Sequence, residues 1–225
     1  MDAPSDLTCR KPPCPLCSNP ATEPFFTHRK RDFLFCPVCD FVFVPPAFHE
    51  SPEQEKLRYT FHQHSLNDPG YRSFLERLFQ PLKSRLAPNA HGLDFGCGQF
   101  PTLSVLFEEA GLSCDNYDLY FAPNRAVFEK TYDVLTCSET IEHFARPREE
   151  FERFLQRVKP GGWIGIMTQL RDEAPSFENW FYKNDVTHVG FFSRATFHYL
   201  AQTYGLRLDL CEQGVILLQL PERSS

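Results

Sequence analysis

Leu93-Asp94-Phe95-Gly96-Cys97-Gly98 is the stretch that decides the fold of this chain. The residues from Gly92 to Phe95 predict a short buried strand, and the two glycines that follow predict a tight turn. The segment 102–111 then repeats apolar residues at helical spacing. An acid, Asp118, ends the next apolar segment, where a carboxylate can accept hydrogen bonds from ribose hydroxyls. This unit predicts a nucleotide-type ligand at the glycine turn, although such turns serve several ligands of that kind.

The segments after Asp118 continue the alternation of strands and helices. We expect strands over 132–137 and 163–168, a polar loop over 138–144, a helix over 147–158 and a turn over 159–162. Ser193 is a candidate helix cap, Gly205 ends that helix, and the strands 206–211 and 215–220 flank a hairpin turn. The sequence therefore predicts an α/β fold with a doubly wound, mostly parallel sheet.

The composition fits one substantial core with a small appendage. The chain has 225 residues, of which 42% are hydrophobic. Its net charge of −6 argues against a general nucleic-acid or anionic-membrane surface. No apolar run approaches the roughly 20 residues of a membrane span, and the first residues lack the features of a signal peptide. Nine cysteines without a secretory signal favour reduced thiols or metal ligands, so we expect a cytoplasmic protein with no membrane partner.

Two C-x-x-C pairs lie near the N-terminus. Cys14 and Cys17 form the first pair and Cys36 and Cys39 the second, with 18 residues between the pairs. Four thiolates complete a tetrahedral zinc shell, and they leave no open position for water, which predicts a structural Zn²⁺. The segment 25–35 between the pairs has the layout of a strand, a basic turn and a strand, so the sequence predicts a small zinc ribbon. A thioredoxin-like redox pair is the rival interpretation, but it needs a βαβ context that is absent from this segment.

The other cysteines and the basic turn have plainer interpretations. We expect the remaining thiols to be small buried hydrophobic side chains, with Cys9 as a spare thiol near the metal; they are Cys9, Cys97, Cys114, Cys137 and Cys211. The basic run from His28 to Arg31 is suited either to gripping a phosphate or to forming a solvated turn, and we favour the turn. The chain is accordingly divided into a zinc ribbon (1–46), linker and lid helices (47–90) and a ligand-binding domain (91–225).

The order of these segments resembles the class I S-adenosylmethionine-dependent methyltransferases over roughly residues 70–220. The whole chain looks like bacterial methyltransferases of the ubiquinone-methylase-like group, from the Pro-Leu-Cys knuckle to the Asp-x-Thr-His-Val-x-Phe-Phe-Ser segment at 185–193. The resemblance implies a Rossmann-like domain that binds S-adenosyl-L-methionine. The cofactor-binding residues that it implies are Asp94, Gly96, Cys97, Gly98, Asp118, Leu119 and Ser138.

The chain departs from the family pattern at two places. Only about 14 residues separate Asp118 from Asp133, where the family usually has a helix, a strand and an acid that contacts adenine. Phe121 or Ser138 is the candidate to serve instead of that acid. In addition, Gln99-Phe100-Pro101 replaces the third small residue of the glycine motif.

The segment from Ser138 to Phe144 resembles the Glu-x-x-Glu-His segment of ubiquinone-biosynthesis O-methyltransferases and small-RNA 2′-O-methyltransferases. The resemblance implies a divalent ion that is held by Glu139, Glu142, His143 and His188 and that polarises a substrate oxygen. Two alternatives stay open: a metal-free base, with Asp185 orienting the later histidine, or packing and cofactor contacts alone. Trp180 and Tyr182 are interpreted as hydrophobic pocket walls. The candidate catalytic residues are Glu139, Glu142, His143, Asp185 and His188, of which His188 or His143 is the candidate base.

The resemblance thus implies an S-adenosylmethionine-dependent methyltransferase that acts on a small-molecule substrate, with O-, N- and C-methylation all open. One alternative is an RNA or protein methyltransferase that docks through the ribbon, although the acidic balance counts against RNA. Another is a catalytically silent module that retains a cofactor pocket. The polar cluster over residues 58–68 is interpreted either as a lid over the cofactor or as a solvated approach to a helix.

Overall fold

The computed structural model describes residues 11–60 and 68–222, and its main part is a six-stranded sheet with the order β5-β4-β6-β7-β10-β9. The neighbours β5 (Ser113–Tyr117), β4 (His91–Phe95), β6 (Tyr132–Ser138) and β7 (Val158–Met167) are parallel. Strand β10 (Val215–Gln219) runs antiparallel to both β7 and β9 (Arg207–Glu212). The doubly wound, mostly parallel sheet is therefore confirmed.

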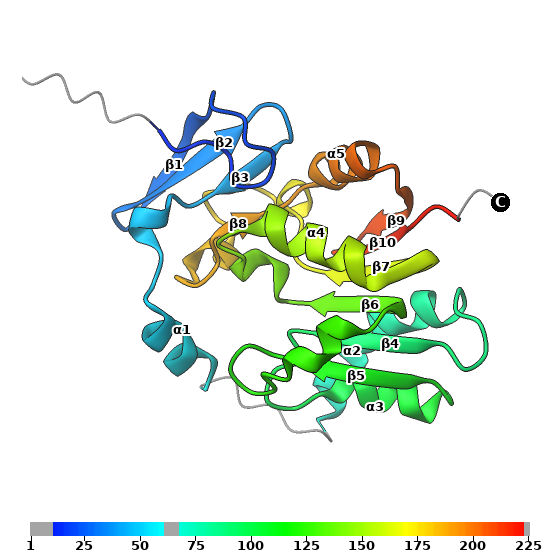
Figure 1. Ribbon diagram of the computed structural model, residues 1–225. Coiled ribbons are helices and arrows are strands. Elements are labelled where there is room, and N and C mark those ends of the chain that lie inside the picture. The colour runs from blue at the N-terminus through cyan, green and yellow to red at the C-terminus, as the bar shows by residue number, and fades with distance from the viewer. Residues whose placement is uncertain (1–10, 61–67, 223–225) are drawn as a thin grey trace, which may run out of the picture.

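Helices cover both faces of this sheet (Figure 1). Helices α2 (Pro69–Lys83) and α3 (Thr102–Glu109) supply buried side chains to one core, and α4 (Pro147–Arg157) and α5 (Arg194–Tyr204) supply them to the other. Strand β10 shows the alternation that feeds two cores: Val215 and Leu217 belong to the first, whereas Ile216 and Leu218 belong to the second. The sheet is thus buried on both faces, and a ligand has access only at its edges and strand ends.

The helix boundaries follow the capping signals in the sequence. The carboxylate of Asp68 accepts hydrogen bonds from the first backbone N–H groups of α2, at 2.8 Å from Gly70. Ser193 and Thr196 form a reciprocal capping box at the start of α5, and Gly205 ends that helix with a φ of 65°. The turn expected over 159–162 is wrong, because β7 already begins at Val158 and continues through this segment.

The ribbon is a sheet whose fourth strand comes from the other end of the chain. Strands β1 (Glu23–His28), β2 (Arg31–Cys36) and β3 (Phe41–Phe43) form the predicted antiparallel hairpin and its neighbour. The short strand β8 (Gly190–Phe191) then pairs with β3. A Cβ on Gly190 would lie 2.8 Å from the ring of Phe41, so this approach requires glycine. The ribbon is therefore joined by backbone pairing to the segment that precedes α5 (Figure 1).

The remaining elements are short and lie in the connections. They are the 3-10 helices η1 (Pro46–Phe48), η2 (Arg125–Glu129), η3 (Ile141–His143), η4 (Arg171–Glu173) and η5 (Phe181–Asn184), and the helix α1 (Pro52–Tyr59). Between Asp118 and the start of β6, η2 is the one helix that the structure describes. Strand β5 lies at the edge of the six-stranded sheet within the described residues. No described helix has the length and apolar character needed to cross a bilayer.

Candidate active site

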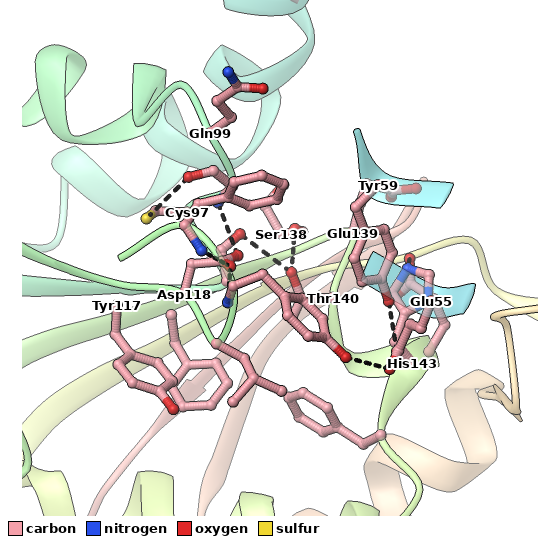
Figure 2. A pocket seen from close by; sticks show the side chains of 18 of the residues that line it. Glu55, Tyr59, Cys97, Gln99, Tyr117, Asp118, Ser138, Glu139, Thr140 and His143 are labelled. Atoms are coloured by element: carbon pink, nitrogen blue, oxygen red, sulfur yellow. Dashed lines mark hydrogen bonds and ion pairs between the residues drawn. The ribbon is translucent and has the colours of Figure 1, made fainter. Parts of the chain in front are cut away.

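A cavity of about 1030 Å³ opens at the C-terminal ends of β4, β5 and β6. The chain crosses from β5 on one side of β4 to β6 on the other, and such a reversal is where ligands bind in open α/β sheets. Two facing groups of residues line the cavity (Figure 2). We call residues 96–100 and 117–121 the glycine wall, and residues 138–143 together with His188 the histidine wall.

The glycine wall is held together by backbone contacts. Gly96 has a φ of 80°, and a Cβ there would lie 2.2 Å from the hydroxyl oxygen of Thr140, so only glycine fits. The backbone N–H of Gly98 donates to Oδ2 of Asp118 at 3.1 Å. The other oxygen of Asp118 accepts from the N–H groups of Tyr120 and Phe121, at 2.8 and 3.0 Å. The acid and the glycine turn thus form one rigid unit.

The structure brings six of the seven predicted cofactor residues to the cavity. These are Gly96, Cys97, Gly98, Asp118, Leu119 and Ser138. Asp94 is absent from the lining: its side chain is 3% exposed and accepts a hydrogen bond from the Thr136 hydroxyl at 2.9 Å. Burial raises the pKa of Asp94 to about 7. The strand thus turns the carboxyl of Asp94 into the interior, and a direct cofactor contact by Asp94 stays a prediction.

Ser138 and Phe121, the two candidates to replace the acid that contacts adenine in the family, both line the cavity. The hydroxyl of Ser138 is buried and has no hydrogen-bond partner within the described part of the chain. A buried hydroxyl without a partner is unfavourable, and it indicates a group that waits for a ligand. Phe121 lies on the opposite wall. The choice between the two stays a prediction.

Helix α1 lies across the cavity mouth. Its Glu55 accepts a hydrogen bond from the hydroxyl of Tyr120 on the glycine wall, at 2.7 Å. Its Arg58 donates to both carboxylate oxygens of Asp185, at 2.9 and 3.1 Å. Its Tyr59 places its ring edge-on to His143, with the centroids 5.2 Å apart. Of the expected polar cluster, His62, His64 and Asn67 lie outside the described residues, whereas α1 contacts both sides of the mouth (Figure 2).

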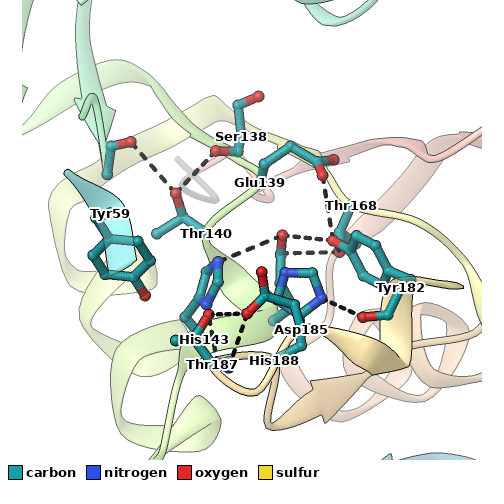
Figure 3. Close-up of polar contacts among 12 residues, drawn as sticks. Tyr59, Ser138, Glu139, Thr140, His143, Thr168, Tyr182, Asp185, Thr187 and His188 are labelled. Atoms are coloured by element: carbon teal, nitrogen blue, oxygen red, sulfur yellow. Dashed lines mark hydrogen bonds and ion pairs between the residues drawn. The ribbon is translucent and has the colours of Figure 1, made fainter. Parts of the chain in front are cut away.

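The two histidines of the histidine wall are fixed by backbone carbonyls (Figure 3). Nδ1 of His143 lies 3.0 Å from the carbonyl oxygen of Thr187, and Nδ1 of His188 lies 2.8 Å from that of Tyr182. A carbonyl oxygen only accepts, so each Nδ1 carries the proton and each neutral ring has a bare Nε2. The ring centroids are 4.7 Å apart. Two imidazole lone pairs are thus presented in one place.

Glu142 completes this group of donor atoms. It is fully buried, and its oxygens accept from the hydroxyl of Tyr182 at 2.5 Å and that of Thr168 at 3.0 Å. One ligand atom each from Glu142, His143 and His188 lies within 4.8 Å of the others. A carboxylate and two neutral imidazoles, each oriented by a further hydrogen bond, are typical of a divalent metal site in proteins.

Glu139, the fourth residue of the predicted ligand set, lies beside this group and outside it. One of its carboxyl oxygens lies 3.4 Å from the hydroxyl oxygen of Tyr182, whose proton is donated to Glu142. Its backbone is left-handed, with a φ of 45°, which is strained for glutamate. Burial, followed by the charge of Glu142, raises the pKa of Glu139 to about 9. Three of the four predicted ligands therefore converge, and the fourth lines the cavity beside them.

The expectation that Asp185 orients His188 is wrong. The Asp185 carboxylate is engaged by Arg58 and by the N–H and hydroxyl of Thr187, whereas His188 is oriented by the Tyr182 carbonyl. The charge of Asp185 favours protonated His188, but burial outweighs it and lowers the pKa of His188 to about 4. His188 is therefore neutral at pH 7, as a base or a metal ligand must be.

The four ribbon cysteines form a second group of donor atoms. Their sulfurs all lie within 4.8 Å of one another, with 3.6 Å from Cys14 to Cys39 and 3.4 Å from Cys17 to Cys36. Sulfurs bound tetrahedrally to zinc are about 3.8 Å apart. The residue after each pair, Ser18 or Asp40, has a left-handed backbone, so the two knuckles share one shape. This geometry fits a tetrahedral ion with no open position.

Several residues at the site were missed or misread from the sequence. Tyr182 was expected as a hydrophobic wall, yet its hydroxyl and its carbonyl serve Glu142 and His188. The hydrogen bond from Thr168 to Glu142 was not predicted, because the sequence placed Thr168 at the end of a strand and indicated nothing more. Arg31 was assigned to a solvated turn, but its guanidinium is bonded to the carbonyls of the His188 loop. No local pattern marks the contacts of Arg31, because they join residues 154 and 157 positions apart.

Comparison with known proteins is consistent with this geometry. The methyltransferase domain family matches residues 65–210, which is more than half of the chain. The ubiquinone biosynthesis O-methyltransferase of Paraburkholderia xenovorans is 30% identical over 87 residues, which are 39% of this chain and 38% of that enzyme. The enzyme of the same name from Hydrogenovibrio crunogenus is 38% identical over 58 residues, 25% of this chain and 24% of that one. The chain thus spans well under half the length of these curated relatives.

Solved structures show the same fold at low identity. The 1,6-didemethyltoxoflavin-N1-methyltransferase of Burkholderia thailandensis has a TM-score of 0.52 at 13% identity, covering 89% of this chain and 100% of that one. The O-methyltransferase NcsB1 from neocarzinostatin biosynthesis, with S-adenosyl-L-homocysteine and 1,4-dihydroxy-2-naphthoic acid, has a TM-score of 0.51 at 15% identity, covering 67% of this chain and 56% of that one. This likeness concerns the fold.

Proposed function

Because the chain belongs to the methyltransferase domain family, we propose that it transfers a methyl group from S-adenosylmethionine to a hydroxyl group of a small molecule. The observation that carries the proposal is the convergence of Glu142, His143 and His188 on the cavity, opposite the glycine turn. Two further facts support it: the curated relatives are O-methyltransferases, and two solved structures of this fold are complexes with small-molecule ligands.

In this proposal the glycine wall binds the cofactor. Gly96 and Gly98 allow the ligand to approach the backbone, and Asp118 accepts hydrogen bonds from the ribose hydroxyls. Asp118 is suited to this role because three backbone N–H groups hold its carboxylate in one orientation. The unpartnered Ser138 hydroxyl supplies a further polar contact from the end of β6. Rigid positioning matters because methyl transfer depends mainly on aligning the donor with its acceptor.

The histidine wall fits a divalent cation. Glu142, His143 and His188 would hold it, and Tyr182 and Thr168 would keep the Glu142 carboxylate in place. When bound, such a cation supplies Lewis acidity, which makes a neighbouring substrate hydroxyl easier to deprotonate. The neutral state of both imidazoles is what ligation requires.

The chain's own residues supply the remaining requirements. Helix α1 closes the mouth through Glu55 and Arg58, and the aromatic lining excludes water from the reacting atoms. In the alternative without a cation, the bare Nε2 of His143 or His188 accepts the proton of the substrate hydroxyl instead. The position of α1 across the mouth favours a small substrate over a macromolecule. In the ribbon, the four cysteines would hold a structural Zn²⁺.

The function is tested with a labelled methyl donor. Cofactor carrying a radioactive methyl group is incubated with the protein and a cell extract, and the extract is then separated into low-mass, RNA and protein fractions. The proposal predicts label in the low-mass fraction that is stable to base, as an aryl or alkyl ether is. Label confined to RNA or protein would favour the macromolecular alternative, and no label in any fraction would favour a silent binding module.

A chelator distinguishes a cation from a metal-free base. Transfer should stop with a chelator too mild to remove the ribbon metal and should return when Mg²⁺ or Mn²⁺ is added. Zinc content, measured in the same samples, is the control. Unchanged transfer in the chelator would leave His188 or His143 as a plain base and would remove the cation from the proposal.

A further inference from the structure

The loop that carries His188 has little regular structure of its own. It follows η5 and precedes β8, and within it His188 is joined to Asp185 by a single backbone hydrogen bond of 3.2 Å. Such a segment does not hold an imidazole in one place by itself. The bond from Nδ1 of His188 to the carbonyl of Tyr182 orients the ring, and contacts from outside the loop add to it by holding the backbone.

Three backbone carbonyls of this loop converge on one guanidinium. Arg31 donates from one nitrogen to the carbonyls of Lys183 and Asp185, at 3.5 and 3.1 Å, and from the other to that of His188 itself, at 2.8 Å. The planar fork of arginine suits several acceptors at once, whereas a single ammonium does not. The Arg31 guanidinium thus holds the backbone of residues 183–188 at three points.

The ribbon holds both sides of His188. Arg31 is the first residue of β2 and contacts the loop before and at His188, whereas β3 pairs with β8, which begins two residues after it. Between them, the N–H of Val44 donates to the carbonyl of Val189 at 2.9 Å. Strand β2 ends at Cys36, one of the four clustered cysteines. The position of His188 is therefore tied to a ribbon that the cysteine cluster organises.

We propose that Arg31 is a positioning residue for the histidine wall, through which the folded ribbon holds His188 in line with Glu142 and His143. The inference rests on the proposed function for its catalytic meaning, since it explains why a methyltransferase core carries this ribbon. In this inference Arg31 supports the histidine wall and has no role in the glycine wall, which binds the cofactor.

The test compares Arg31→Met with Arg29→Met. Methionine keeps the aliphatic part of the side chain and removes all the donors. Arg29 is exposed on the tip of the same hairpin, so its variant controls for the loss of one positive charge. Three quantities are measured on the zinc-loaded full chain: Mn²⁺ affinity, affinity for S-adenosylhomocysteine, and the ring signals of His188 in two-bond ¹H–¹⁵N spectra.

Arg31→Met should weaken Mn²⁺ binding by about 10- to 100-fold, as loss of a residue that orients a ligand does. The His188 ring signals should move or broaden, while S-adenosylhomocysteine affinity and zinc content stay unchanged. Arg29→Met should match the wild type in all respects. A general loss of stability would lower the affinities for both Mn²⁺ and S-adenosylhomocysteine. A loss of Mn²⁺ affinity alone therefore identifies a positioning role.

Unchanged His188 signals together with wild-type Mn²⁺ affinity in Arg31→Met would overturn the inference. If the wild type binds no Mn²⁺, the cation of the proposed function fails, but the His188 signals still decide whether Arg31 positions that ring. Should Arg31→Met lose its zinc, Arg31→Lys replaces it, because lysine keeps the charge and the stem. Lysine should give the same changes to a smaller extent, and identity with the wild type would again refute the role.

Discussion

The two walls of the cavity are built in different ways. The glycine wall comes from two neighbouring strands, and the contacts between its own residues, such as that of Gly98 with Asp118, join residues about 20 positions apart. The histidine wall combines the end of β6, the His188 loop, Tyr182 and, through Arg31, the ribbon, with contacts that span up to 157 positions. The internal contacts of the glycine wall are local, whereas those of the histidine wall depend on the assembled tertiary structure.

This difference matches the demands of the two halves of the proposed reaction. A cofactor that is always the same is served by a short, rigid turn, whereas the substrate side needs side chains of several kinds placed together. The difference also predicts that changes in the two walls should have separable effects. The predictions below are arranged from the largest expected effect to the smallest.

The replacement His188→Ala should separate the walls most clearly. Removing one of the two bare imidazole nitrogens should slow methyl transfer by ~10²–10⁴-fold, the usual range for a positioned acid–base group. The affinity for S-adenosylhomocysteine should change little, because the glycine wall is untouched. Transfer is measured with the labelled donor and binding by calorimetry. Unimpaired turnover would leave His188 as a packing residue.

Loss of the ribbon metal should damage one wall and spare the other. Purified protein should hold about one zinc per chain, and Cys36→Ser should release it and unfold the ribbon before the core. Because the ribbon holds the His188 loop, Mn²⁺ binding should weaken as well, while cofactor affinity stays near the wild-type value. Elemental analysis and two calorimetric titrations check these points; absence of zinc from fresh, reduced protein would contradict the first.

The variant Tyr182→Phe should have a smaller effect on the same wall. The ring packing remains, but the buried Glu142 carboxylate loses its 2.5 Å donor, which should cost about 1–3 kcal/mol of unfolding free energy. Transfer should fall as well, because Glu142 is then less firmly oriented. Phe181, which is 69% exposed, offers a matched control in Phe181→Ala. Equal stability of Tyr182→Phe and wild type would show that the hydroxyl has no such role.

Substitutions at the hairpin tip of the ribbon should raise the stability of the ribbon without affecting either wall of the cavity. Arg29 and Lys30 both have a left-handed backbone, with φ values of 49° and 66°. Asn-Gly is the preferred pair for such a two-residue turn, so the double change Arg29→Asn and Lys30→Gly should stabilise the ribbon by about 1 kcal/mol. Chemical denaturation gives the stability change, and both ligand affinities should stay constant. A loss of stability would show that the arginine and lysine side chains have contacts of their own.

The same contrast explains what the sequence could predict. The strands, the capped helices, the glycine turn and the cysteine pairs follow from periodicity and spacing, because their causes lie within a few residues. The shortened segment after Asp118 was also visible, as a count of residues. The hydrogen bond of Asp94 to Thr136 in the interior was not visible, because alternation along a strand decides only which face a side chain takes.

The histidine wall was predictable only in outline. Its acids and histidines were identified through a resemblance, but the partner of each imidazole was not. Asp185 was expected to orient His188 because it is near in sequence, yet Arg58 of α1 binds that carboxylate from 127 positions away. Arg31 gave no sign of its contacts, because a basic hairpin tip is normally solvated. Long-range pairing of polar groups is set by the packed structure, and no local pattern encodes it.

The central claim is that the glycine wall binds the cofactor, and calorimetric titration with S-adenosylhomocysteine tests it most directly. The wild type should bind one equivalent per chain, and Asp118→Ala should bind about 10- to 100-fold more weakly, because a charged hydrogen bond to the ribose is lost. His188→Ala serves as the matched variant on the opposite wall and should bind as the wild type does. A wild type that fails to bind, or an Asp118→Ala variant of unchanged affinity, would contradict the account.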